Sequence, residues 1–178
     1  RKTLRQLAVH VVGGGLQGKA VAGRIEGHRE GQTLASGRAA ELAASTAEEG
    51  CIGETIAACI AAEQLTLATD PAVRRVLEVI VADESRHAEL AFRTVAWAIR
   101  VGGTTVRTAV ARVFDAMNIS EPVGDDHQND MLVAHGRLTP LIEQWAKRRA
   151  MDEVVRPVLR RLLDASIESF PRVVSAPS

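Results

Sequence analysis

Hydrophobic residues recur at every third or fourth position over most of the chain, which is the spacing of an amphipathic α-helix. This period predicts helices over 36–68, 71–101 and 104–117, a short one over 128–135, and a last long helix from Pro140. No segment alternates hydrophobic and polar residues in the way that a half-buried strand does. The pattern therefore predicts an all-α fold.

Capping residues and glycines set the limits between these helices. Asp70 followed by Pro71 supplies an N-cap and a first-turn proline, so the second helix is expected to begin there. Gly102 and Gly103 are expected to end it. Pro157 is expected to kink the last helix, because proline removes a backbone hydrogen bond from a helix interior. The link between the first two helices is short, which predicts that they pack antiparallel as a hairpin.

The helical pattern defines one domain, over residues 36–170. Residues 1–35 precede it and remain poorly determined by the pattern, although a short apolar stretch at 3–12 predicts a helix. Glycines interrupt the rest of that segment, and no structure is predicted there. Residues 171–178 are predicted to form a disordered tail.

Composition argues against some partners. The chain has 22 Lys and Arg against 22 Asp and Glu, so no net charge attracts nucleic acid or an anionic membrane. No run reaches the ~18 apolar residues that a membrane span requires. Cys51 and Cys59 share one predicted helix and lie ~12 Å apart along its axis, which is too far for a disulfide. We therefore expect a cytoplasmic protein without nucleic-acid or membrane partners.

The apolar face of the predicted helix over 71–101 is interrupted by two polar residues. Stepping along it by alternating fours and threes places Glu84 and His87 between hydrophobic positions, three residues apart and therefore on one face. The sequence thus predicts that both side chains point into the core. Trp97, on the same helix, is expected to be a core residue as well. The whole seam consists of Val73, Leu77, Ile80, Glu84, His87, Ala91, Thr94 and Ala98.

The preceding helix has a matching seam with one charged member, Glu54. Its other members are small or apolar, namely Ala44, Ala47, Cys51, Ala58, Ala61, Leu65 and Ala68. In an antiparallel hairpin that turns near Thr69, Glu54 and Glu84 are equally far from the turn, so they should meet at one level together with His87. Burying carboxylates without a partner costs several kcal/mol. A divalent metal ion bound by the three residues is the simplest compensation.

Glu54 on one helix, followed on the next by Glu84-x-x-His87, resembles half of the site in ferritin-like di-metal carboxylate proteins. Those bundles take a Glu from each of two helices and a Glu-x-x-His from each of the other two. The stretches EEGCIGET, ADESRHAELAFR and RAMDEVVRPVLRRLL extend the resemblance to bacterial ferritin-like domain proteins over roughly residues 38–165. The resemblance implies a ferritin-like antiparallel helical bundle with a di-iron or di-manganese centre.

The other half of such a site is absent from the sequence. Glu26 and His28 are only two residues apart, and His10 has no carboxylate three residues before it. Three explanations stay open. The missing ligands lie upstream of Arg1; or two chains form a homodimer that assembles four Glu and two His; or the site is degenerate and the domain is structural.

The resemblance implies an oxidoreductase that acts with O₂ or peroxide, or iron handling without turnover, and it assigns no catalytic residue. The chain has no tyrosine, which excludes a tyrosyl-radical role, and no C-x-x-C pair, which excludes a rubredoxin-like module. The alternative interpretation is a non-catalytic helical bundle. In it Glu84 and His87 form an internal ion pair near Arg86 or Arg93, and Glu54 pairs with a Lys or Arg from another helix.

Overall fold

A computed structural model describes residues 29–121, 123 and 130–165 of the chain. Every regular element in these ranges is a helix, so the all-α prediction is confirmed. The predictions for 1–28, which include the short helix at 3–12, and for the tail at 171–178 lie outside the described residues. No helix in the described part is both long enough and apolar enough to cross a membrane.

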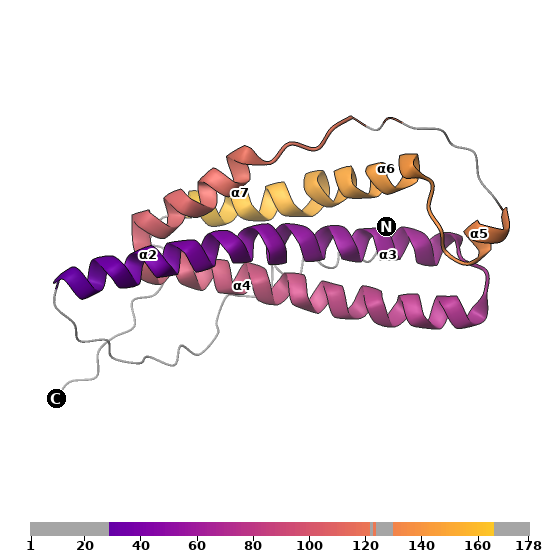
Figure 1. Ribbon diagram of the computed structural model, residues 1–178, viewed down its shortest axis with the longest axis horizontal. Coiled ribbons are helices and arrows are strands. Elements are labelled where there is room, and N and C mark those ends of the chain that lie inside the picture. The colour runs from indigo at the N-terminus through magenta and orange to yellow at the C-terminus, as the bar shows by residue number, and fades with distance from the viewer. Residues whose placement is uncertain (1–28, 122, 124–129, 166–178) are drawn as a thin grey trace.

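Three consecutive helical elements form what we call the first rod: α2 (Arg29–Ser45), the π-helix η1 (Thr46–Glu54) and α3 (Thr55–Leu67). Helix α4 (Pro71–Ala116) returns antiparallel beside the first rod and contacts all three of its elements (Figure 1). The predicted hairpin is therefore confirmed. The first rod begins seven residues before the predicted start at residue 36.

The hairpin turn uses the residues that the sequence indicated. The Asp70 carboxylate accepts hydrogen bonds from two backbone N–H groups in the first turn of α4, at 2.8 and 2.9 Å. Arg74 donates from its Nη1 atom to the carbonyl oxygens of Leu65 (2.7 Å) and Ala68 (2.8 Å) at the end of the first rod. Both free helix ends at the turn are thus capped by side chains.

The path of α4 breaks at Gly103, whose φ of 60° and ψ of −140° are not helical. This conformation is open to glycine and strained for other residues. Beyond Gly103 the chain turns back over the end of the bundle and forms another helical segment up to Ala116 (Figure 1). The predicted break at Gly102-Gly103 is therefore confirmed.

The C-terminal part of the bundle consists of α5 (Asp130–Ala134), α6 (Pro140–Ala150), the π-helix η2 (Met151–Val155) and α7 (Arg156–Asp164). Pro157 lies in the first turn of α7, directly after the π-helix η2, and the kink expected at this residue stays a prediction. Arg107 donates hydrogen bonds to the carbonyl oxygens of Leu163 (2.8 Å) and Ala165 (2.5 Å), so the segment after Gly103 caps the end of α7.

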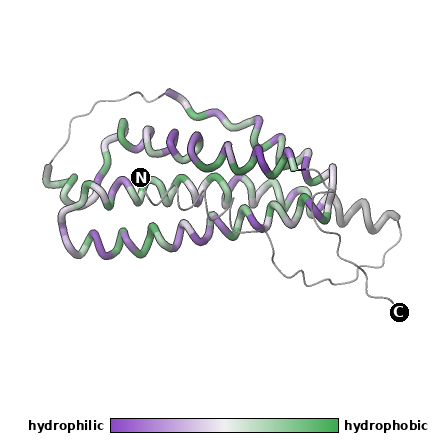
Figure 2. The backbone as a smooth tube through the Cα atoms, turned by 180° about the vertical axis from the view of Figure 1, so that it is seen from behind, coloured by the Kyte–Doolittle hydropathy of each residue, from purple (hydrophilic) through white to green (hydrophobic). Residues whose placement is uncertain are grey.

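The core is built from small side chains where α4 meets the first rod and includes larger ones from η2 and α7. Gly50 marks the closest approach: a Cβ atom on it would lie 2.5 Å from the Cβ of Ala91. Hydrophobic and hydrophilic residues alternate along α4, as expected for a helix with a buried face (Figure 2). The largest fully buried side chains are Phe92, Ile99, Met151 and Leu159.

We predict that Gly50→Ala destabilises the protein by about 1–3 kcal/mol, because the new methyl group forces α4 away from the first rod. The free energy of unfolding in urea measures this. Ala91→Gly in the same chain should restore part of the loss, since it removes the opposing Cβ atom. Gly53→Ala is the matched control: its Cβ would come no closer than 3.7 Å to the carbonyl oxygen of Glu48, so it should not destabilise. Equal losses for Gly50→Ala and Gly53→Ala would contradict this account.

Candidate metal centre

Glu54, Glu84 and His87 converge in the structure. One ligand atom from each, a carboxylate oxygen or an imidazole nitrogen, lies within 4.8 Å of the other two. Glu54 comes from the last position of η1, and Glu84 and His87 come from the middle of α4. The meeting of the three groups at one level, as the hairpin register predicted, is therefore confirmed.

The π-helix η1 decides where Glu54 points. A π-helix has more residues per turn than an α-helix, so every fourth residue stays on the buried face. This face runs through Ala43, Ala47, Cys51, Thr55 and Cys59. Glu54 is therefore displaced to the edge of that face, beside buried Thr55, and Ala44 in the predicted seam is replaced by Ala43.

Threonine hydroxyls bond to the helix backbone near both ends of η1. Thr46 donates to the carbonyl oxygen of Leu42 at 2.7 Å, and Thr55 donates to that of Cys51 at 2.6 Å. Such bonds to the carbonyl four residues earlier commonly bend helices. π-Helical segments are rare and occur often at functional sites. The sequence pattern did not reveal η1.

The prediction that Glu84 and His87 point into the core is wrong. The Glu84 side chain is 26% exposed and that of His87 is 59% exposed. The buried face of α4 is rotated from the predicted seam and runs through Leu77, Val81, Ala88, Ala91, Phe92, Val95, Ala98 and Ile99. The three groups thus form a half-open site at the seam between two helices.

The Glu84 carboxylate affects the ionisation of Glu54. A hydrogen bond with Glu84 raises the pKa of Glu54, and burial and the charge of Glu84 raise it further, while His87 acts in the opposite direction. His87 Nδ1 lies 3.6 Å from Glu84 Oε2. Two neighbouring carboxylates next to an imidazole are a group that a divalent cation would stabilise.

Among the described residues, no arginine forms an ion pair with Glu54 or Glu84. Arg86 pairs with Asp83 instead, and Arg93 lies 3.5 Å from Glu89. Among the described residues, Glu54 has no ion pair with a Lys or Arg. Within the described ranges, the non-catalytic interpretation is thus supported only by the contact between His87 and Glu84.

The neighbours of Glu54 in sequence do not join the group. Cys51 is fully buried, and burial raises the pKa of its thiol far above the usual range. Burial also raises the pKa of Cys59 to about 12. Both are free thiols, as predicted, and Cys51 is a core residue. Glu48 and Glu49 are exposed.

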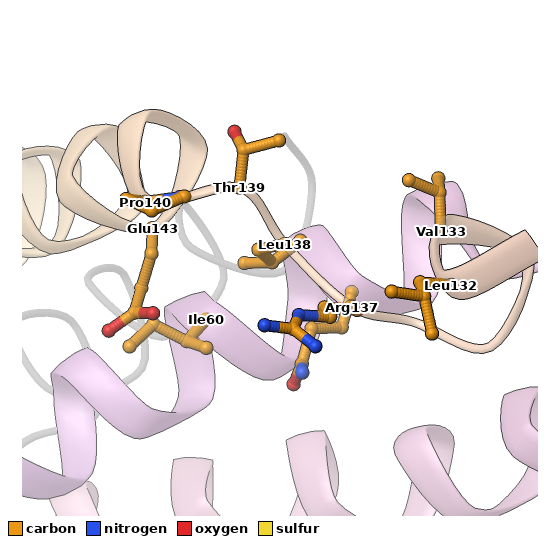
Figure 3. A pocket seen from close by; sticks show the side chains of 9 residues that line it. Ile60, Leu132, Val133, Arg137, Leu138, Thr139, Pro140 and Glu143 are labelled. Carbon is orange, nitrogen blue, oxygen red and sulfur yellow. The ribbon is translucent and has the colours of Figure 1, made fainter. Parts of the chain in front are cut away.

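A second concave site lies between α3 and the chain that enters α6. It is a hollow of about 510 Å³, in which Glu143 extends toward Ile60 of α3, with Arg137 and Gln64 nearby (Figure 3). The sequence pattern did not predict it, because its lining comes from segments far apart in the chain. It contains none of the three converging residues.

Comparisons with protein-family models, with curated proteins and with solved structures find no match for this chain. The geometry of Glu54, Glu84 and His87 therefore carries the functional argument.

We predict that Glu54→Gln stabilises the metal-free protein at pH 7 and that the gain disappears near pH 4. Because the pKa of Glu54 is raised, its contribution to the free energy of unfolding is present at acid pH and is lost as the pH rises past the folded-state value. The gain should be on the order of 1 kcal/mol or less, as for other partly exposed charge pairs.

Thermal unfolding at both pH values, with a chelator present, measures this gain. Glu78→Gln is the control, because Glu78 is exposed on the same helix and outside the group. A gain of equal size at both pH values would rule out relief of the carboxylate pair as its cause.

Proposed function

We propose that this chain binds a divalent transition metal, iron or manganese, through Glu54, Glu84 and His87. The observation that supports this most directly is the convergence of two carboxylates and one imidazole from two helices to within 4.8 Å. The raised pKa of Glu54 adds support, because it shows that the two carboxylates lack enough positive charge.

The donor set fits these metals. Carboxylate oxygens suit manganese and imidazole suits iron, so a mixed oxygen and nitrogen set is compatible with both. Three protein ligands on a half-open surface leave coordination positions for water or a substrate. A bound metal would supply a redox centre that is accessible to O₂ or peroxide, and the proposed reaction class is therefore an oxidoreductase of the ferritin-like di-metal type.

The chain carries half of the ligands of a dinuclear carboxylate centre, which uses four Glu and two His. A second copy of the chain is proposed to bring its own three ligands near this group, so that two ions are held in neighbouring sites. In this proposal Glu54, Glu84 and His87 bind the metal.

A second candidate is a non-catalytic helical module, and the 3.6 Å contact between His87 and Glu84 favours it. In that case the imidazole would neutralise Glu84 and no metal would be needed. The two candidates differ in one measurable property, which is retention of metal after loading.

We predict that the protein retains about one metal ion per chain after anaerobic loading with Fe(II) or Mn(II) and desalting, and that Glu84→Ala abolishes retention. Removing one of three ligands should lower the affinity at least 10-fold, since even changes to residues outside the ligand set cost 10- to 100-fold. Metal analysis of the desalted protein measures this.

Glu78→Ala is the matched control, because it removes an exposed carboxylate from the same helix without touching the group. It should retain metal like the unaltered chain. Failure of the unaltered chain to retain either metal would eliminate the metal proposal and leave the non-catalytic module.

A further inference from the structure

Helix α4 carries a second apolar stripe outside the core. Its hydrophobic members are Val76, Ile80, Leu90, Trp97 and Val101, which are between 38% and 65% exposed. Together with the polar residues Asp83, His87 and Thr94, they follow one another at intervals of four and three residues in turn, over about seven helical turns. Nothing in the part of the chain that the structure describes covers this stripe. Trp97, which was expected in the core, belongs to it.

Alternating fours and threes is the pattern by which one helix packs along another. We propose that a second copy of this chain packs its α4 antiparallel on this stripe, about a two-fold axis between residues 88 and 89. This register matches hydrophobic with hydrophobic and polar with polar at its three outer levels, and places His87 against Leu90 at the centre. The pairs are Val76–Val101, Ile80–Trp97, Asp83–Thr94 and His87–Leu90.

The charges beside the stripe are compatible with this pairing. Asp83, the one carboxylate within the stripe, falls at the level of the partner's Arg93. Within each copy Asp83 already pairs with Arg86, and Arg93 with Glu89. The two ion pairs would therefore lie side by side across the interface as a neutral network, which limits the cost of covering Asp83.

The size of the stripe sets the expected affinity. Its 25-residue span is about 38 Å long, and with a helix diameter of about 10 Å it covers roughly 380 Å² on each copy. The two copies together cover roughly 760 Å², which is below the ~1,200 Å² of standard specific interfaces and fits a weak, transient contact. We therefore expect a dimer that dissociates in the micromolar range rather than the nanomolar range.

In an alternative register the two-fold axis passes beside Glu84, at residue 85. The Glu84 residues of the two copies would then lie within ~3 Å of each other along the helices. This register places Val76 against the partner's Thr94 and leaves Val101 without an apolar partner. The proposed register covers all five hydrophobic residues of the stripe, so it has the larger hydrophobic gain.

The proposed register brings the two candidate metal sites next to each other. This step rests on the metal-binding function proposed above. The two His87 residues would lie ~4.5 Å apart along the helices, while the two Glu84 residues would lie ~14 Å apart. Each group of two carboxylates and one imidazole thus gains the partner's His87 as a neighbour. The dimer would hold two ions in adjoining sites, with the imidazoles between them.

Two tryptophans allow a matched test of the stripe. Trp97 lies in it, and Trp145 lies on α6 with nearly the same exposure, 46% against 51%. Sedimentation of the metal-free 178-residue chain should show a concentration-dependent dimer from roughly 1 to 100 µM. Trp97→Glu should weaken the dimer at least 10-fold, and Trp145→Glu should leave it unchanged.

The register is tested by the double variant Val76→Cys/Val101→Cys, which should form a covalent dimer under mild oxidation because the two positions meet across the axis. Each single variant should remain uncross-linked, since its own position lies ~38 Å from that of the partner. A dimer without this cross-link would overturn the register.

A chain that stays monomeric at the highest concentration would overturn the proposal and assign the stripe to another occupant. These tests distinguish a failure of the dimer proposal from a failure of the metal-site proposal. Dimerisation is measured without metal, and metal retention is measured on the monomeric Trp97→Glu variant as well as on the unaltered chain.

Discussion

The short distance between α4 and the first rod is the constraint on which the candidate site depends. Gly50 faces Ala91 so closely that a Cβ atom at position 50 would not fit beside that of Ala91. Alanines fill most of the neighbouring interface. Larger residues would hold the helices farther apart. Glu54 and Glu84 would then no longer reach the same point, because glutamate side chains extend only a few ångströms beyond the backbone. Small residues in the core therefore position the polar residues at its edge.

The hairpin and its limits could be predicted because local chemistry fixes them. Asp70, Pro71 and Gly103 act through capping, a fixed φ angle and a positive φ angle, and each of these is a property of the residue itself. The level at which Glu54 meets Glu84 follows from counting residues on either side of the turn. For this reason the convergence of Glu54, Glu84 and His87 was predicted correctly from the sequence.

The direction of the side chains could not be predicted in the same way. Helix α4 has two apolar faces, one through Val81, Phe92 and Val95 and one through Ile80, Leu90 and Trp97. Residues at intervals of four and three can be followed along either face of such a helix. The predicted seam combined residues of both faces. The π-helix η1 adds a second rotation that no local signal in the sequence indicates. The first effect places His87 at the surface, and the second moves Glu54 to the edge of the buried face.

The exposed position of His87 connects the site with the outer stripe of α4. An imidazole in the core would belong to one chain alone, whereas His87 stands at the edge of the carboxylate pair and in the middle of an uncovered apolar stripe. Whatever covers that stripe also excludes water from the imidazole and from Glu84. Removing water strengthens the interaction of carboxylates with a cation, because the effective dielectric constant falls. The metal-free pair would at the same time become harder to keep charged, so covering the stripe and binding a cation would favour each other.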